Sequence, residues 1–344
     1  QVLTFAITGI EAILIKTEVN ITSKIPKFKV IGLPDPAIKE AKHRVKTAIN
    51  NSGYRFPYRR ILINLAPASI KKQGPQYDLP IAVGLLAANG QLPLEKLESI
   101  AFVGELALDG SIRPVKGIIS MVESAYKNGI KKIVVPKDNA QEAAMPDLLK
   151  VYPVKSLVEA VILLISEQEI PCYKFQENAD KEKKFIDYKE VGGQEYSKRA
   201  MLIAAAGNHH CLMSGPPGSG KTMLAKRIIT ILPKLDIKKA IETTRIYSIS
   251  GLLSQEYGLI QIPPFRAPHH TISNAGMAGG GSHPKPGELS LAHNGVLFLD
   301  ELPEFARNTL EVLRPPLEEG RVIISRAKET VDYPANFLFI AAMN

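Results

Sequence analysis

A short glycine-rich segment has the residue types and spacing that phosphate binding requires. Residues 215–222 read GPPGSGKT and match the pattern G-x-x-x-x-G-K-[ST] in full. Glycines let backbone N–H groups turn toward phosphate oxygens, and the lysine contacts the β- and γ-phosphates. The segment therefore predicts a nucleoside triphosphate site formed by Gly215, Pro216, Pro217, Gly218, Ser219, Gly220, Lys221 and Thr222. Within it, Thr222 is the expected magnesium ligand.

Two acidic residues follow an apolar run further along the chain. The run is 296–299, and the acids are Asp300 and Glu301. Carboxylates at the end of a buried strand are typical of a Walker B motif. We expect Asp300 to hold magnesium through its water shell and Glu301 to act as the general base on the attacking water. The alternative is an ordinary strand with acids at its exit.

A third polar residue also ends an apolar run. Residues 337–343 predict a strand, and Asn344 follows it. Its amide is a candidate sensor 1, which would orient the lytic water between the two Walker strands. The alternative is a polar residue that happens to end a strand.

The elements that must position these residues alternate between strand and helix. We expect helices at 194–206, 221–231 and near 303–317, strands at 211–213, 296–299 and 337–342, and a hairpin near 322–331. The strand, glycine turn and helix around the phosphate loop form one βαβ unit. This half therefore predicts an α/β domain built on a parallel sheet.

A charged, aperiodic stretch separates that half from the residues before it. We interpret 167–190 as a linker between a first domain, 1–166, and a second, 191–344. In the first domain the pattern predicts strands at 13–21, 61–65 and 133–135 and helices at 37–51, 79–88 and 118–126. The first domain is thus mixed α/β.

Composition narrows the class of protein. The 344 residues are 45% hydrophobic and carry a formal net charge of +9, which favours an anionic partner such as a nucleic acid. Two cysteines are too few for a disulfide framework, which indicates a cytoplasmic setting. Every apolar run is shorter than the roughly 18 residues of a membrane span. Because the chain begins with Gln1 and stops at Asn344, we expect further residues at both ends.

Three long segments together resemble one family. The segments 193–225, 265–305 and 339–344 are similar to the ComM family of magnesium-chelatase-like AAA+ ATPases. The resemblance implies ATP and Mg²⁺ as cofactors and a bacterial hexameric motor that promotes DNA branch migration in natural transformation and recombination. It also implies an arginine finger and a helical lid with sensor 2, which would lie beyond residue 344. Because an arginine finger is worth about 10³ to 10⁵ in rate, we expect residues 1–344 alone to hydrolyse ATP poorly.

The first domain resembles the proteolytic domain of Lon proteases, which has a ribosomal-S5-like α+β fold. Residues 73–80 resemble the Lon segment with the nucleophilic serine, and 104–136 resemble the segment with its lysine. Gln76 stands in the place of the serine and Ile119 in the place of the lysine. Neither side chain can perform nucleophilic catalysis, so the domain is expected to be non-proteolytic.

A long segment rich in Gly, Pro, Ser and His lies between the Walker motifs. Residues 266–286 resemble the helix-2 insert of the magnesium-chelatase group, which would project toward the hexamer pore and contact DNA. In this interpretation Gly279, Gly280 and Gly281 would let the loop move. The alternative is a surface loop packed on its own domain. We read its histidines as polar loop residues rather than zinc ligands, since the segment has no cysteine or acid at ligand spacing; they are His269, His270 and His283.

The first domain also carries a basic segment, 39–72. Its one acid is Glu40, and its cations are Lys39, Lys42, Arg44, Lys46, Arg55, Arg59, Arg60, Lys71 and Lys72. Such a cluster could follow a phosphate backbone, with Tyr54, Phe56 and Tyr58 stacking on single-stranded bases. The alternative is a solvated helix face followed by an aromatic turn that packs in the core.

The sequence thus favours an ATP-driven motor that acts on single-stranded or branched DNA as a homo-oligomer, with no membrane segment. One alternative is the motor subunit of a chelatase that inserts a metal into a porphyrin, against which the Lon-like domain argues. A second is a scaffold that senses ATP with little turnover, against which the complete pair of Asp300 and Glu301 argues.

Overall fold

The computed structural model describes the chain except for residues 167–169, 177–186, 254–257, 282–283 and 327–328. The chain divides into two compact units, one up to residue 177 and one from residue 178 to Asn344, apart from the stretch 254–258, which groups with the first. Each unit is described by itself. Among the described residues, no helix has the length and apolar character needed to cross a bilayer.

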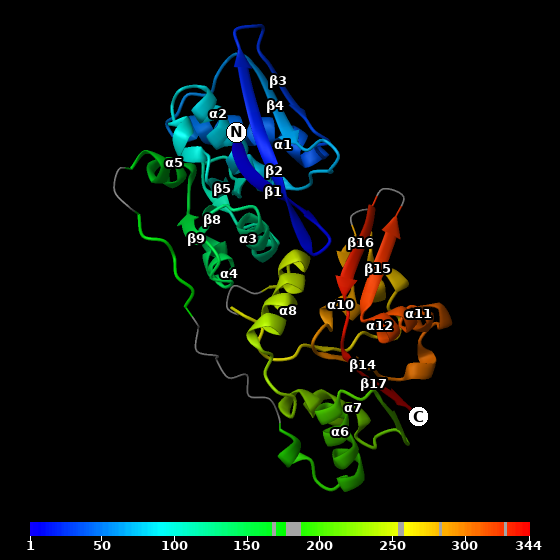
Figure 1. Ribbon diagram of the computed structural model, residues 1–344. Helices are drawn as coiled ribbons and strands as arrows, with labels where there is room; N and C mark the ends of the chain where they lie inside the picture. The colour runs from blue at the N-terminus through cyan, green and yellow to red at the C-terminus, as the bar shows by residue number, and fades with distance from the viewer. Residues whose placement is uncertain (167–169, 177–186, 254–257, 282–283, 327–328) are drawn as a thin grey trace. The chain divides into compact units, whose positions relative to one another are not determined.

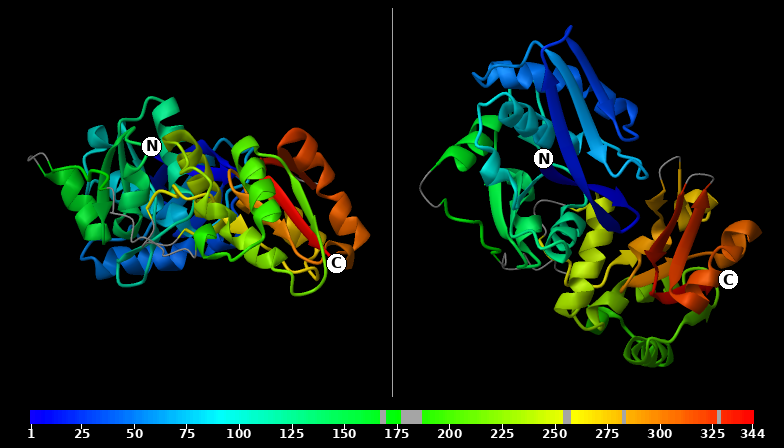
Figure 2. Two further views of the ribbon diagram at one scale, coloured as in Figure 1. Left: turned by 90° about the horizontal axis from the view of Figure 1, so that it is seen from below. Right: turned by 45° about the horizontal axis from the view of Figure 1, so that its top comes forward.

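The first unit is built on a seven-stranded mixed sheet in the order β3-β4-β2-β1-β5-β8-β9 (Figure 1). The strands are β1 (Val2–Thr8), β2 (Glu11–Thr22), β3 (Lys27–Ile31), β4 (Arg60–Ala66), β5 (Ile100–Phe102), β8 (Lys132–Pro136) and β9 (Lys150–Val154). The antiparallel β1 and β2, drawn in dark blue in Figure 2, lie in the middle of the sheet. A small ribbon pairs β6 (Glu105–Leu106) with β7 (Ile112–Arg113).

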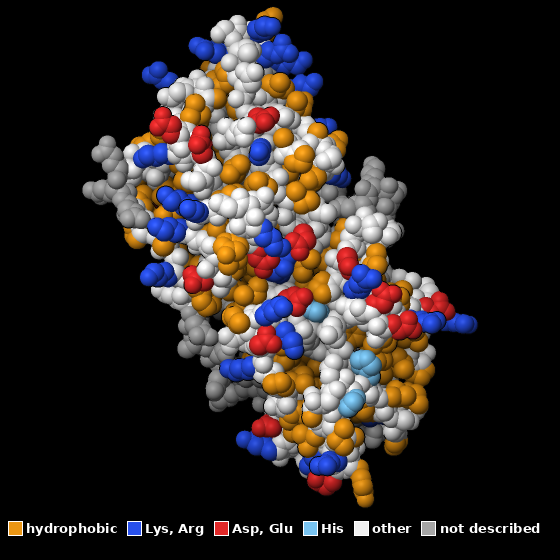
Figure 3. Space-filling model, in the orientation of Figure 1, with side chains coloured by type: hydrophobic (Ala, Val, Ile, Leu, Met, Phe, Trp, Pro, Cys, Tyr) orange, Lys and Arg blue, Asp and Glu red, His pale blue; other side chains and the backbone are white. Residues whose placement is uncertain are grey.

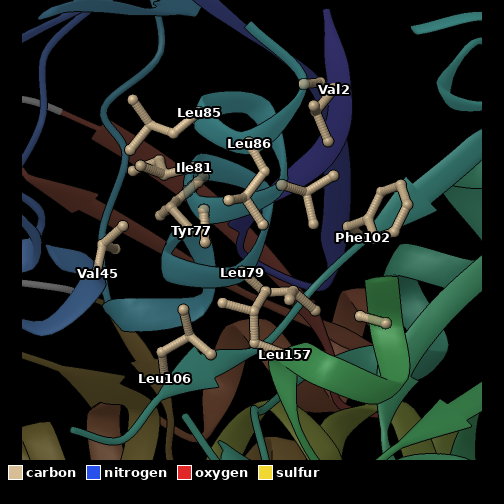
Figure 4. Close-up of a cluster of buried hydrophobic side chains, with 14 of the residues drawn as sticks. Val2, Val45, Tyr77, Leu79, Ile81, Leu85, Leu86, Phe102, Leu106 and Leu157 are labelled. Atoms are coloured by element: carbon tan, nitrogen blue, oxygen red, sulfur yellow. The ribbon is translucent and has the colours of Figure 1, made fainter. Parts of the chain in front are cut away.

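Helices cover both faces of this sheet. They are α1 (Pro36–Asn51), α2 (Asp78–Ala88), α3 (Ile118–Lys127), α4 (Ala140–Ala144) and α5 (Leu157–Ile165). Alternate residues of β5 enter two different cores: Phe102 packs with α1, α2 and α5 (Figure 4), whereas Ala101 packs with α3 and α4. Asp35 caps α1 through the backbone N–H of Ile38, which explains why the helix begins at Pro36. The predicted mixed α/β fold is confirmed.

The second unit has a four-stranded parallel sheet in the order β10-β17-β14-β11. Its strands are β10 (Cys211–Ser214), β11 (Phe265–Arg266), β14 (Val296–Leu299) and β17 (Leu338–Met343), and all three pairings are parallel. The long helices are α6 (Glu195–Gly207), α7 (Lys221–Arg227) and α8 (Ile237–Ser250). The predicted parallel-sheet domain is confirmed, whereas α8 and β11 were not predicted.

Two predicted helices differ from the structure. The helix expected to reach residue 231 ends at Arg227 and continues as a 3₁₀ turn, Ile228–Thr230. The helix expected near 303–317 is broken into the 3₁₀ turn Leu302–Glu304, α11 (Arg307–Glu311) and α12 (Arg314–Glu319). Pro315 and Pro316 explain the break: proline lacks the N–H that an earlier turn would need, but its fixed φ suits the first turn of a new helix.

The segment 266–286 contains regular secondary structure where the sequence predicts a loop. Its described residues form α9 (Asn274–Ala278) and the hairpin of β12 (Gly279–Gly280) and β13 (Lys285–Pro286), followed by α10 (Glu288–Leu291). Met277 is fully buried. Gly279 has φ +103°, and a Cβ there would lie 2.3 Å from the Lys285 carbonyl oxygen. The glycine thus permits close packing, and the segment packs on its own unit. The predicted hairpin after it is present as β15 (Arg321–Arg326) and β16 (Glu329–Pro334).

Candidate nucleotide site

The glycine-rich loop connects the end of β10 to the start of α7. Gly218 and Gly220 have φ values of +76° and +86°, which residues with a Cβ rarely adopt. The backbone N–H of Gly215 donates to the carbonyl of Met343 at 3.3 Å, so the loop begins beside the end of β17. The left-handed backbone thus favours glycine at Gly220, which the sequence pattern fixes, and at Gly218, which the pattern leaves variable.

The Lys221 ammonium lies at the centre of the loop. It donates to the carbonyl oxygens of Gly215 at 2.7 Å and Pro216 at 3.0 Å, and to Oδ1 of Asn344 at 2.9 Å. The fold therefore brings Lys221 and Asn344 together although 123 positions separate them. The two residues meet because β17, which Asn344 follows, lies between β10 and β14 in the sheet, and these parallel strands end at the same edge.

Thr222 and Asp300 form the second contact of the site. The hydroxyl of Thr222 donates to Oδ2 of Asp300 at 2.5 Å, and Oδ1 of Asp300 accepts the backbone N–H of Glu301 at 3.0 Å. A hydroxyl and a carboxylate are oxygen ligands of the kind that Mg²⁺ takes. Together with the glycine cradle and the ammonium, this donor set fits a magnesium-bound triphosphate.

Glu301 occupies an unusual backbone position. Its φ is +52°, in the left-handed region, and its side chain is 56% exposed. Oε2 lies 3.5 Å from Nδ1 of His270. The sequence does not link these residues, because it predicts His270 only as a polar loop residue.

The histidines give no metal site in the described part of the chain. His269 and His270 stack on each other, with ring centroids 4.0 Å apart, and His283 lies outside the described residues. No group of three His, Cys, Asp or Glu side chains converges there as metal ligands do.

Two side chains N-terminal to the loop hold it in place. The Tyr188 hydroxyl donates to the carbonyl of Leu224 in α7 at 2.7 Å, and burial raises the pKa of Tyr188 to about 12. Gln194 donates through Nε2 to the carbonyl of Ser219 at 2.8 Å. The sequence does not indicate either contact, because Tyr188 lies within the stretch interpreted as a linker and Gln194 is the residue that precedes α6.

The basic segment 39–72 is only partly available to an anion. Lys72 is fully buried and donates to the carbonyl of Pro67, and burial lowers its pKa. Arg44 pairs with Asp78 at 2.8 Å. Phe56 is buried in the core, whereas Tyr58 is exposed and lies under the ammonium of Lys46. Arg44, Lys72 and Phe56 are therefore not available to a nucleic acid, and the burial of Phe56 agrees with the alternative of an aromatic turn that packs in the core.

Comparison with known proteins places this site in a family. A family model described as magnesium chelatase, subunit ChlI, matches residues 187–344, and a second ChlI model matches residues 17–139. The competence protein ComM of Haemophilus influenzae is 44% identical over 342 residues, or 98% of this chain and 66% of that protein. The YifB protein of Escherichia coli is 46% identical over 341 residues, or 99% of this chain and 67% of that protein.

The chain belongs to the ComM/YifB family of magnesium-chelatase-like AAA+ proteins. It spans about two thirds of the length of these relatives. The N-terminal region of this chain is also similar to Lon proteases. Lon protease 2 of Bacillus subtilis is 28% identical to this chain over 153 residues, which are 42% of this chain and 27% of that protein. Ile119 stands at the position where the Lon resemblance predicts the catalytic lysine, and it is fully buried in this domain.

Proposed function

We propose that the second unit binds ATP with Mg²⁺ and hydrolyses it, and that the whole protein is an ATP-driven motor that acts on DNA as a ring of identical subunits. The observation that carries this proposal is the 2.5 Å contact between Thr222 and Asp300, beside the glycine cradle and Lys221. Membership of the magnesium-chelatase-like AAA+ family supports ATPase activity. We further propose that 1–166 and 191–344 are separate domains.

Each residue has a defined part in this proposal. The backbone N–H groups of Gly218, Ser219 and Gly220 and the Lys221 ammonium would hold the phosphate oxygens, and Thr222 and Asp300 would hold the metal. Bound Mg·ATP supplies an electrophilic terminal phosphate. Glu301 accepts the proton of the attacking water at its carboxylate, and the Asn344 amide orients that water.

Three observations support DNA as the partner. The relative from Haemophilus influenzae is named a competence protein, and the net charge of this chain is +9. Lys27 and Arg60 are neighbours on β3 and β4, and Lys and Arg side chains gather over the ends of these strands on the face shown in Figure 3. We propose branch migration during transformation and recombination as the reaction, with single-stranded or branched DNA as the substrate.

One variant tests the hydrolytic assignment in the intact protein. Glu301→Gln should leave ATP binding unchanged and abolish turnover, because the amide cannot accept the proton of water. Glu304→Gln is a matched control, since Glu304 is an exposed acid three positions further on. Binding is measured by fluorescent-nucleotide titration and turnover by phosphate release. Full turnover in Glu301→Gln would contradict the assignment.

The family models also keep a second candidate open. The descriptions of both family models name a subunit of magnesium chelatase. A chelatase motor would hydrolyse ATP without any response to DNA. ATP turnover of the intact protein with and without branched DNA separates the two functions. Stimulation by DNA supports the DNA motor, indifference supports the chelatase-type motor, and an absence of turnover supports an ATP-sensing scaffold.

A further inference from the structure

We infer that His270 is a positioning residue for Glu301, and that the segment 266–286 is thereby part of the hydrolytic apparatus. The inference rests on the proposed ATPase function and goes beyond it, because it assigns a role to a residue outside the Walker motifs. The contact that carries it joins His270 Nδ1 to Glu301 Oε2 at 3.5 Å.

Glu301 has a fixed backbone and a free side chain. Its N–H donates to Asp300 Oδ1 at 3.0 Å, and its carbonyl accepts the N–H of Glu304 at 2.8 Å, so both sides of the residue are held. The left-handed φ of +52° is a strained conformation that such contacts must maintain. The carboxylate is attached through three rotatable bonds, and more than half of the side chain is exposed. A general base of this kind needs a contact that selects one orientation.

His270 is well placed to provide that contact. Its ring lies tilted by 37° against that of His269, with centroids 4.0 Å apart, and meets the ring of Phe305 edge-on at 6.4 Å. The side chain of His270 is only 31% exposed. Nδ1 of His269 lies 3.0 Å from the hydroxyl of Thr271, which restricts that ring in turn. The imidazole is therefore held on two sides while Nδ1 faces the carboxylate.

The segment that carries His270 is anchored at its base and along its length. Arg266 and Glu288 close the base with two hydrogen bonds of 2.6 Å, which raise the pKa of Arg266. The Thr309 hydroxyl donates to Asn274 at 2.8 Å and ties α9 to α11. β11, which precedes His270, is also the sheet neighbour of β14, which precedes Glu301. Adjacent strands thus deliver the two residues to one edge of the sheet.

The distance defines the kind of interaction. At 3.5 Å the pair is within the range of an electrostatic contact, and it must close by about 0.5 Å to form a hydrogen bond of ordinary length. A small torsional change in the glutamate side chain covers that distance. An imidazole that carries its proton on Nδ1 then donates to Oε2, which leaves Oε1 to accept the proton of water.

Kinetics of the intact protein test this role. His270→Ala should lower kcat for ATP by about tenfold, with KM and fluorescent-nucleotide affinity within about twofold, because orientation of the base affects turnover and not binding. His270→Asn should recover at least half of the wild-type kcat, since its amide N–H lies near the position of Nδ1. Lys285→Ala, which changes an exposed side chain of the same segment, should behave as wild type. An unchanged kcat in His270→Ala, or equal losses of binding and turnover, would overturn the role.

A double variant separates a direct contact from a general structural effect. In Glu301→Asp the shorter side chain withdraws the carboxylate from His270. Adding His270→Ala to this background should therefore change kcat by less than about twofold. A further tenfold loss would show that His270 acts on something other than Glu301.

A measurement that needs no turnover keeps the inference distinct from the proposed function. Cys172 and Cys211 are first replaced by serine, and His270→Cys is combined with Glu301→Cys. Dibromobimane, which becomes fluorescent when it joins two neighbouring thiols, should bridge this pair and neither single-cysteine variant. A wild-type protein without ATPase activity but with a bridged pair would refute the proposed function alone. The absence of bridging would refute the placement of His270.

Discussion

At the scale of single residues, the site depends on a hydroxyl that bonds to a carboxylate. Thr222→Val keeps the shape of the side chain and removes the hydroxyl that contacts Asp300 at 2.5 Å. Because magnesium would lose one oxygen ligand, we expect ATP affinity in the presence of Mg²⁺ to fall by about 10- to 100-fold. Affinity measured in EDTA should change little. The titration is followed with a fluorescent ATP analogue.

A matched control is available on the turn that follows the same helix. The Thr230 hydroxyl donates to the carbonyl of Arg227 at 2.7 Å and contacts none of the residues assigned to the nucleotide. Thr230→Val should therefore bind ATP as the wild type does, with and without magnesium. An equal loss in both variants, or a loss for Thr222→Val that persists in EDTA, would argue against a metal ligand at Thr222.

The residues of the candidate site were predictable to different degrees. Lys221, Thr222, Asp300 and Asn344 lie on three neighbouring strand ends or just after them, and parallel topology brings such ends to one edge. His270 was not predictable as a partner of Glu301, because β11, the strand that precedes His270 and pairs with β14, was not predicted from the sequence. A two-residue strand is too short to show a periodic pattern.

At the scale of elements, a buried ion pair joins two helices of the first unit. Arg44 of α1 donates to both carboxylate oxygens of Asp78, the first residue of α2, at 2.8 and 3.1 Å. Asp78 is fully buried, and burial raises its pKa to about 6, although the bonds to Arg44 oppose this shift. From the sequence Arg44 is expected on an exposed helix face, and nothing indicates its pairing with Asp78, which lies 34 positions away.

Breaking this pair should cost more stability at neutral pH than in mild acid. Arg44→Met leaves an unpaired buried carboxylate, and at pH 7.5 we expect the free energy of unfolding to fall by about 3 kcal/mol. At pH 5, below the pKa of about 6, the folded protein keeps the proton on Asp78 and needs no cation, so the loss should be smaller. Urea denaturation at both pH values measures the difference.

The double variant Arg44→Met, Asp78→Leu controls for lost packing. Removing both charged groups should restore part of the stability at pH 7.5 and make the difference from wild type smaller than for Arg44→Met alone. A loss in Arg44→Met that is as large at pH 5 as at pH 7.5 would mean that the carboxylate is not the cause.

Helix boundaries show where element-level prediction stops. The stripe of Ile38, Ala41, Val45 and Ile49 predicted α1 correctly, because one apolar face of a helix repeats every three or four residues. The same reasoning predicted one helix over 303–317, because apolar periodicity does not show where one helix stops and the next begins. In the segment 266–286, burial of Met277 and the close packing at Gly279 depend on contacts with residues distant in sequence.

At the scale of the whole molecule, charge indicates which residues of the first domain would contribute to the proposed binding of DNA. With Lys72 buried and Arg44 paired, the exposed cations of the basic segment include Lys39, Lys42 and Arg59. These residues can contact phosphates without any rearrangement of the core. The sequence shows only that cations are concentrated in the segment 39–72. Burial in the folded domain decides which of these cations can reach a phosphate.

Replacing Lys39, Lys42 and Arg59 together by glutamine should weaken binding of single-stranded DNA by the intact protein. Each lost phosphate contact lowers the slope of log affinity against log salt by about 0.7, so three lost contacts should reduce it by about 2. The control replaces Lys116, Lys131 and Lys137, three exposed lysines outside the segment, and changes the net charge equally. If both triple variants lose the same slope, the effect is that of net charge, and the segment 39–72 has no specific part in binding.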